Sequence, residues 1–304
     1  MQIWRSLLFV PANQERMLNK LNDLPADGFI FDLEDTIPDP EKNNARQMTL
    51  EAMPKVLGSR SWVRVNGLST GFFHEDVDAL VGAKGLVGFI VPKMDSLEEV
   101  SAVDKMIASL EIRRNLAVGS TPIIVMMESA NGVLDSRKIM TSSKRIQSMI
   151  YGGGEDGDMN VSLGATWTSA GPEMMFVRQF SLTSARAAGF ECPLDGVFSN
   201  VKDPEGFRSD TQLSRRLGFR GRTVIHPNQI EDANLIYTPT AAQIEYYTRV
   251  VEAYQEALTR GIASTTVDGK LVDLAMSKTA QRLLDHVKAI EDMESITGFV
   301  RKKL

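Results

Sequence analysis

Short apolar runs alternate with longer amphipathic segments along most of this chain. Eight apolar runs occupy residues 6–11, 27–35, 61–66, 85–93, 121–129, 148–156, 193–200 and 219–227. They are rich in Val, Ile and Phe and almost continuously apolar, as is typical of strands covered on both faces. The segments between them, such as 41–53, 96–111, 172–188 and 205–218, have the spacing of amphipathic helices. Eight strands alternating with helices predict an α/β fold, the (β/α)8 TIM barrel.

The pattern changes after His226-Pro227. Two long helical segments, 241–261 and 275–293, are separated by a stretch with an Asp268-Gly269 turn signal. We therefore expect residues 1–235 to form the barrel and residues 236–304 to form a C-terminal helical extension. A doubly wound parallel sheet is the alternative, but its dinucleotide-binding version loses support because no GxGxxG motif follows the first run.

The composition narrows the class of protein and its partners. The chain has 304 residues, 43% of them hydrophobic and 24% charged, with a formal net charge of -5. These values are typical of a soluble globular protein without a basic excess, so we expect neither nucleic acid nor a membrane surface as a partner. Since no apolar run has the length of a signal or membrane segment, we expect a cytoplasmic protein.

Cysteine and histidine are too sparse for the metal sites that they commonly build. Cys192 is the only cysteine, which excludes an intrachain disulfide and a multi-cysteine zinc site. The three histidines, His74, His226 and His286, lie far apart and lack the spacing of a metal-binding motif. His74 and His286 fall in helical stretches and are expected to be solvated.

Polar side chains stand at the carboxyl ends of nearly all the predicted strands. They are Glu34, Asp35, Arg64, Asn66, Lys93, Glu128, Glu155, Asp156, Asn200 and His226. Barrel active sites lie at this face, where each loop contributes a residue or two. Charged groups there are costly to bury alone, so the set is expected to pair internally, with a ligand or with a metal. Taken singly, any one of them could merely mark where a strand runs into a polar loop.

Two of these carboxylates are suitable ligands for Mg²⁺. Glu128 ends an otherwise apolar run, and Asp156 follows the glycine run 152–154 on the next predicted strand. Mg²⁺ prefers oxygen ligands and is commonly held by one or two carboxylates. The structural alternatives are an ion pair for Glu128 and a helix cap for Asp156, and Asp158 is the alternative ligand.

The basic residues of the set have two interpretations. Arg64, inside the run WVRVN, could hold a ligand carboxylate through two hydrogen bonds. It could instead form a buried ion pair with Glu34 or Asp35. Lys93 could bind an anion or support the metal carboxylates.

Nine segments form a pattern that is far more specific together, in this order, than any of them alone. They are RSLLFVPAN, PADGFIFDLEDTIPDPEKNNAR, WVRVN, VPK, MMESANG, GGGED, SARAAGFECPLDGVF, RRLGFRGRTVIHPNQI and DGKLVD. In these segments, from Arg5 to about residue 285, the chain resembles the citrate lyase β-subunit-like enzymes of the HpcH/HpaI aldolase superfamily. That group includes malyl-CoA and citramalyl-CoA lyases.

The resemblance implies a barrel with a C-terminal extension, Mg²⁺ dependence, and carbon–carbon cleavage or formation at an acyl-CoA thioester. It implies a homo-oligomer, a trimer or hexamer, whose substrates are the thioester and a 2-oxo acid. Glu128 and Asp156 match the Mg²⁺ carboxylates, and Arg64 matches the arginine that holds the oxo-acid carboxylate. The remaining matches are Glu34 and Asp35 for an acidic pair near that site, Asp273 for a proton-handling aspartate that reaches a neighbouring subunit, and Phe9, Pro11, Arg16 and Lys20 for the CoA-contacting region.

The expected activity is therefore a Mg²⁺-dependent lyase that converts a malyl, citramalyl or citryl type of 3-hydroxyacyl-CoA thioester to acetyl-CoA and a 2-oxo acid. Ala12 and Gly157 depart from the family pattern in loops near the thioester pocket, which leaves the substrate open. Three alternatives also stay open: a malyl-CoA-type thioesterase, a class II aldolase acting on free oxo acids, and a subunit of a citrate lyase complex acting on an acyl-carrier-protein thioester.

Overall fold

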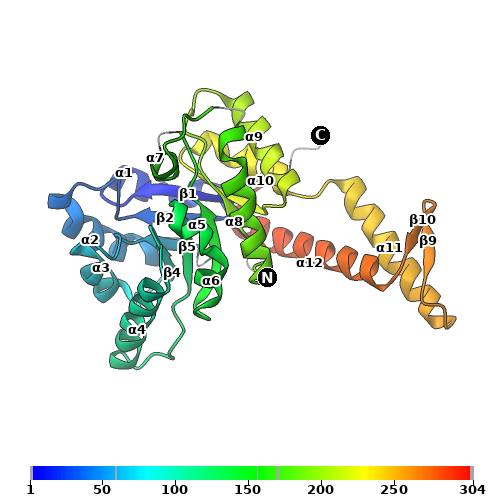
Figure 1. Ribbon diagram of the computed structural model, residues 1–304, viewed down its shortest axis with the longest axis horizontal. Coiled ribbons are helices and arrows are strands. Elements are labelled where there is room, and N and C mark those ends of the chain that lie inside the picture. Colours follow the sequence, from blue (N-terminus) through cyan, green and yellow to red (C-terminus); the bar gives the residue numbers. More distant parts are fainter. Residues whose placement is uncertain (1–2, 59, 156, 169–170, 302–304) are drawn as a thin grey trace.

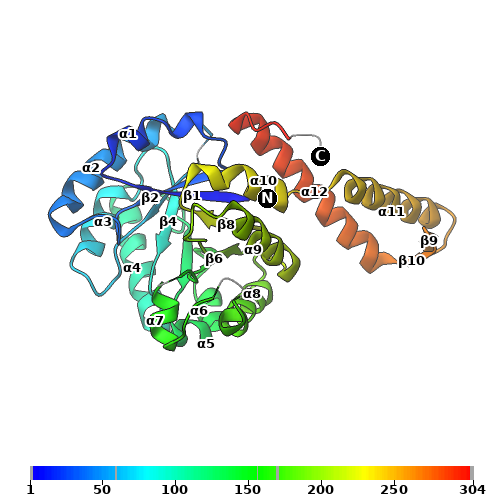
Figure 2. The ribbon, with the colours of Figure 1, turned by 90° about the horizontal axis from the view of Figure 1, so that it is seen from above.

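Eight parallel strands close into a barrel in the computed structural model, which describes residues 3–58, 60–155, 157–168 and 171–301 (Figures 1 and 2). Each strand pairs with the next along the chain, and the last pairs with the first. The strands are β1 (Ser6–Pro11), β2 (Gly28–Asp32), β3 (Ser61–Arg64), β4 (Leu86–Val91), β5 (Ile123–Met127), β6 (Ile146–Tyr151), β7 (Leu194–Asp195) and β8 (Gly221–Val224). This arrangement confirms the (β/α)8 prediction.

Helices follow the strands and surround the barrel (Figure 2). They are α1 (Glu15–Leu18), α2 (Lys42–Ala52), α3 (Phe72–Leu80), α4 (Leu97–Arg113), α5 (Ala130–Leu134), α6 (Ser136–Thr141), α7 (Asp158–Leu163), α8 (Met175–Ala187), α9 (Pro204–Leu217) and α10 (Ile230–Tyr237). Local sequence sets several ends. Ser96 and Glu99 form a capping box that starts α4, and α9 begins at the Asp203 cap with Pro204 in its first turn.

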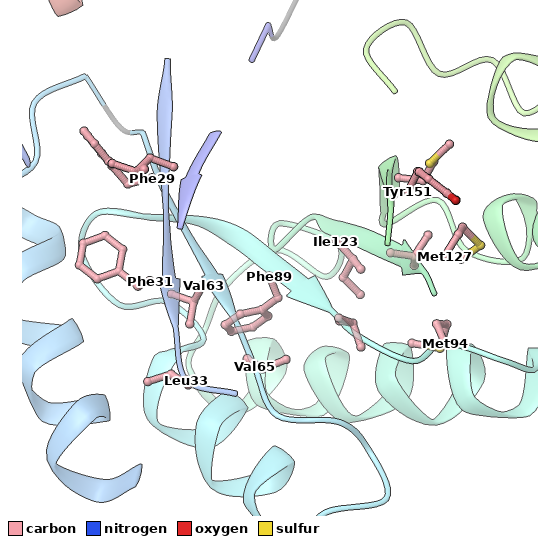
Figure 3. Packing of buried hydrophobic residues seen from close by; sticks show 14 of the residues in the cluster. Phe29, Phe31, Leu33, Val63, Val65, Phe89, Met94, Ile123, Met127 and Tyr151 are labelled. Carbon is pink, nitrogen blue, oxygen red and sulfur yellow. The ribbon is translucent and has the colours of Figure 1, made fainter. Parts of the chain in front are cut away.

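The strands bury both faces, which explains why their sequences are almost continuously apolar. One set of side chains fills the inside of the barrel, including Leu7, Ile30, Trp62, Ile90 and Ile124. The alternate set points outward and packs beneath the helices, as Figure 3 shows for Phe29, Phe31, Val63, Phe89 and Met127. This alternation fixes which strand residues can reach the centre of the barrel.

The C-terminal segment forms an arm that projects from the barrel (Figures 1 and 2). It contains α11 (Ala241–Thr259), a hairpin of β9 (Thr265–Val267) and β10 (Lys270–Val272), and α12 (Leu274–Thr297). Asp268 and Gly269 both have positive φ, 50° and 75°, as a two-residue hairpin turn requires. The arm has its own apolar cluster, made of Val250, Tyr254, Val267, Val272 and Ala280.

The second half of α12 returns to the barrel and buries a histidine that was expected to be solvated. Glu294, near the end of this helix, lies 2.6 Å from the guanidinium of Arg5 beside β1. His286 is only 5% exposed, so the sequence prediction was wrong for this residue. Burial and the nearby charge of Arg220 lower the pKa of His286 to about 4. Among the described helices, none combines the length and apolar character needed to cross a membrane.

Candidate active site

The two-residue period of the strands brings functional side chains to the carboxyl mouth of the barrel. On several strands an apolar residue fills the barrel, and the next inward position carries a residue of the site. These pairs are Leu7 and Phe9, Ile30 and Asp32, Trp62 and Arg64, and Met126 and Glu128. The barrel geometry therefore makes these side chains converge without help from the loops.

Arg64 and Asp32 are register partners on β3 and β2 and form a buried ion pair. Nε and Nη2 of Arg64 donate to the two carboxylate oxygens of Asp32 at 2.7 and 2.8 Å. Burial opposes the charge of Asp32, but Arg64 outweighs it and lowers the pKa of this carboxyl. The sequence analysis did not select Asp32. Its position in FIFD could have identified it. Asp32 lies two residues after Ile30, so both side chains point to the same face of the strand, the inside of the barrel.

The remaining contacts of Arg64 involve the predicted acidic pair and Phe9. Its Nη1 lies 3.0 Å from Glu34 and 3.4 Å from Asp35. The ring of Phe9 stacks on the guanidinium, 4.8 Å from the ring centroid. Arg64 thus forms the predicted contacts with Glu34 and Asp35, but its principal partner is Asp32. Nη1 is the less tightly paired end, and Arg64 lines the cavity at the mouth.

Glu128 follows β5 and is only 6% exposed. Its Oε1 accepts a hydrogen bond from the backbone N–H of Lys93 at 2.7 Å. Burial, together with the negative charge of Glu34, raises the pKa of Glu128 to about 7. Gly152 packs directly against it, since a Cβ at this position would overlap the Cβ of Glu128. The first glycine of the run thus allows close approach of the β6 end to this carboxylate.

Lys93 joins carboxylates from different strand ends. Its Nζ lies 3.2 Å from Glu34, 3.3 Å from Asp158 and 3.8 Å from Asp35. Burial works against its positive charge, but Glu34 and the other two carboxylates raise its pKa above the usual range. Lys93 is therefore a cation that holds three acidic side chains at the mouth of the barrel, and its predicted roles in anion binding or metal support stay predictions.

A cavity of about 230 Å³ opens between these groups. Arg64, Glu128 and Asp158 contribute its charged wall, and Phe9 and Ile150 contribute apolar surface. The glycine run 152–154 also lines it. The cavity can therefore accept a small molecule with a charged end and an apolar or extended remainder.

The charges around the cavity fit a divalent cation. Within the described residues, the carboxylates of the cluster outnumber the cations that contact them; they are Asp32, Glu34, Asp35, Glu128 and Asp158, against Arg64 and Lys93. Glu128 is buried and forms no ion pair with a side chain in the part of the chain that the structure describes. Buried carboxylate oxygens that lack compensating charge are the donors that Mg²⁺ prefers.

The predicted second metal ligand, Asp156, lies outside the described residues. In the part of the chain that the structure does describe, no three His, Cys, Asp or Glu side chains form a metal-holding group. Asp158, the alternative ligand, lies on the cavity wall at the start of α7. Glu128, the described member of the predicted metal pair, lines the cavity, and its role as a metal ligand stays a prediction.

The other predicted site residues lie at the rim or away from it. Pro11 ends β1, while Arg16 and Lys20 are exposed on the segment that follows. Asp273 caps α12 in the projecting arm, where its Oδ1 accepts a hydrogen bond from the N–H of Met276 at 2.9 Å. The cavity lining of this chain does not include Asp273.

The chain is similar to known proteins over most of its length. The family model described as HpcH/HpaI aldolase/citrate lyase matches residues 5–227. The citrate lyase subunit beta of Leuconostoc mesenteroides subsp. cremoris is 33% identical over 98% of this chain and 98% of its own. A (3S)-malyl-CoA thioesterase of Cereibacter sphaeroides is 34% identical over 94% of this chain and 95% of its own.

A solved structure is similar in both sequence and fold. It is the citrate lyase beta subunit from M. tuberculosis, complexed with oxaloacetate and magnesium. It is 25% identical with a TM-score of 0.64, and the match covers 77% of this chain and 97% of that chain. The two relatives in sequence thus have different names, a citrate lyase subunit and a thioesterase. The relative of known structure contains oxaloacetate and magnesium.

Proposed function

The chain belongs to the HpcH/HpaI aldolase/citrate lyase family, and we propose that it is a Mg²⁺-dependent carbon–carbon lyase acting on a 3-hydroxyacyl-CoA thioester. The products would be acetyl-CoA and a 2-oxo acid. The observation that carries the proposal is the buried Glu128 carboxylate, which lines one cavity together with the Arg64 guanidinium and forms no ion pair with any described side chain. The oxaloacetate and magnesium bound to the M. tuberculosis relative support it.

Glu128 and Asp156 would hold the metal, with Asp158 as the alternative to Asp156. Bound there, Mg²⁺ would supply a Lewis acid that polarises the oxygens of the 2-oxo acid half. The burial of Glu128, which forms no ion pair with a described side chain, supports this assignment. Lys93 would keep the acidic side chains in place through its contacts with Glu34 and Asp158.

Arg64 would bind the carboxylate of the substrate. Two of its nitrogens are occupied by Asp32, so the guanidinium plane is fixed before a ligand arrives. Nη1 has longer contacts, to Glu34 and Asp35. It would give up part of these contacts to bind the substrate carboxylate. A preorganised guanidinium stabilises a bound carboxylate at little entropic cost.

Proton transfer and thioester binding would involve residues outside the cavity of one chain. In cleavage, the proton of the substrate hydroxyl would pass to solvent and the carbon–carbon bond would break. This gives the 2-oxo acid and the enolate of acetyl-CoA, whose carbon then takes up a proton. Asp273 of a neighbouring copy would deliver that proton, which requires a homo-oligomer, proposed to be a trimer or hexamer. The exposed arm on which Asp273 lies supports this assignment. Phe9, Pro11, Arg16 and Lys20 would contact the CoA moiety.

Replacing Asp273 by Asn is expected to lower turnover by about 100-fold or more, because general acid–base catalysis commonly contributes that much. Asn is also a good helix cap, so α12 should keep its start. The measurement is kcat at saturating Mg²⁺, with Mg²⁺ affinity expected to stay unchanged. Asp268→Asn in the same hairpin is the matched control, since Asp268 pairs with Arg249 at the surface. An unaltered kcat in Asp273→Asn would remove Asp273 from the scheme.

Magnesium binding is expected to weaken as the pH falls below about 7. The raised pKa of Glu128 means that the metal-free carboxyl takes up a proton near pH 7, and only the ionised form binds Mg²⁺. Below that pH the affinity should fall by about tenfold per pH unit, and above it the affinity should level off. Calorimetric titration of Mg²⁺ from pH 5.5 to 8.5, about the range that spans this pKa, measures the effect. A constant affinity between about pH 5.5 and 8 would contradict the assignment of Glu128.

The reaction itself is tested with a panel of 3-hydroxyacyl-CoA thioesters, with and without Mg²⁺. A lyase releases the 2-oxo acid together with acetyl-CoA. A thioesterase releases free CoA and the hydroxy acid, and the name of the C. sphaeroides relative makes this the second candidate. Activity restricted to acyl-carrier-protein thioesters would instead favour a subunit of a citrate lyase complex, as the L. mesenteroides relative is named.

A further inference from the structure

A second cavity, of about 600 Å³, lies at the opposite end of the barrel from the candidate active site. We name it the basic cavity. Residues that precede β7 and β8 form one wall, and side chains of α11 and α12 form the other; the charged and aromatic ones are Arg186, Phe190, Glu191, Arg215, Arg220, Tyr247, Arg282 and His286. Because these segments enter the amino ends of their strands, the basic cavity is separated from the active site by the length of the barrel.

Four arginines line the basic cavity, and none forms an ion pair with a carboxylate among the described residues. Arg186 donates to the carbonyl oxygens of Phe190, Glu191 and Gly218. Arg215 donates to the carbonyl oxygen of Ile236 and the side chain of Gln243.

The other two arginines, Arg220 and Arg282, form no side-chain hydrogen bond within the described residues. The charge of Arg220 adds to burial in lowering the pKa values of Arg186 and Arg215. Like charges are therefore held together here, and Glu191, the acidic residue of the cavity lining, forms no ion pair with them within the described residues. Arg64, in contrast, has three carboxylate neighbours.

His286 adds a buried imidazole to the wall of the basic cavity. Its side chain lines the cavity from α12, and the residue is only 5% exposed. Its Nε2 is buried and has no hydrogen-bond partner. Because its pKa is lowered to about 4, His286 is a neutral part of this wall and adds no charge to the four arginines.

We propose that the basic cavity binds a small phosphorylated anion carrying several negative charges, of the size of a nucleoside polyphosphate. Guanidinium groups match phosphate oxygens with paired hydrogen bonds, and four of them call for more than one negative charge. The volume falls within the range of small-molecule sites, and Tyr247 and Phe190 offer rings against which a base can pack. Nothing in this inference depends on the reaction proposed for the active site.

The test uses inorganic pyrophosphate as the probe, titrated calorimetrically into the full chain without Mg²⁺. One site per chain is expected, with an affinity that falls as salt rises. Arg220→Gln and Arg282→Gln should each weaken binding about tenfold or more, as loss of a charge-assisted hydrogen bond does. Arg16→Gln, at the other end of the barrel, should bind as the unaltered chain does. ATP should bind more tightly than pyrophosphate, and Tyr247→Leu should reduce that difference.

Arg282 is exposed, so Arg282→Gln is expected to fold. If Arg220→Gln unfolds, Arg282→Gln alone still tests the proposal. Failure of pyrophosphate to bind at millimolar concentration overturns the proposal. Loss of binding in Arg16→Gln but not in Arg282→Gln also overturns it, because the phosphate would then occupy the CoA-contacting region. If pyrophosphate does not bind and Arg282→Gln alters the oligomeric state in sedimentation, the arginines belong to a subunit contact and the proposal fails.

Discussion

Glu128→Gln is expected to lower Mg²⁺-dependent turnover by more than about 100-fold. Substitution of residues that only hydrogen-bond to metal ligands commonly lowers metal affinity or activity by about 10- to 100-fold, and loss of a ligand should lower it further. The substitution keeps the shape of the side chain and its hydrogen bond from the Lys93 N–H, but it removes the charge that would bind the metal. The same change should stabilise the metal-free chain by on the order of 2 kcal/mol at pH 8, since the buried carboxylate has a raised pKa of about 7.

Activity across a Mg²⁺ titration and thermal unfolding in EDTA measure the two effects. Glu155→Gln is the matched control, because Glu155 lines the same cavity but is exposed. Its turnover should stay within a few-fold of the unaltered chain. Persistence of activity at low Mg²⁺ in Glu128→Gln would refute the ligand assignment.

Arg64→Gln is expected to lower both activity and stability. The activity should fall by about 100-fold or more, since the substrate carboxylate loses its guanidinium partner. The free energy of unfolding should fall by about 3–5 kcal/mol, because Asp32 would remain buried as an unpaired charge. Urea unfolding and kcat/KM measure the two losses.

A second substitution separates the two roles of Arg64. In Asp32→Asn/Arg64→Gln the unpaired charge is gone, so most of the lost stability should return while the activity stays low. This contrast would locate the catalytic loss in substrate binding and not in a damaged barrel. Recovery of activity in the double variant would contradict the role of Arg64 as the carboxylate-binding residue.

The barrel was predictable because its strands carry a strong local signal. The runs that became β1 to β8 are apolar on both faces, and the polar residues that follow them lie at one end of the barrel by topology alone. Family resemblance then supplied roles for Arg64 and Glu128. Both side chains line the mouth cavity, while their roles stay predictions.

The missed features depend on pairing between segments distant in the chain. Asp32 looked like one acid among several in FDLED, and only its register with Arg64 on β3 makes it the principal partner. His286 has helical neighbours in sequence, and its burial follows from the return of α12 to the barrel near Arg5. The role of Asp273 at a neighbouring subunit came from the resemblance and stays a prediction, since Asp273 is not in the cavity lining of its own chain.

The register match between Asp32 and Arg64 has a consequence for how such enzymes diverge. Both residues sit on adjacent strands, so the group proposed to grip the acid end of the substrate is held by the backbone of the barrel itself. The loops that follow the strands can then change in length and composition without moving Arg64, the residue proposed to bind the substrate carboxylate. New carbon skeletons can be accommodated by remodelling a connection, while the ancestral chemistry persists at the strand ends.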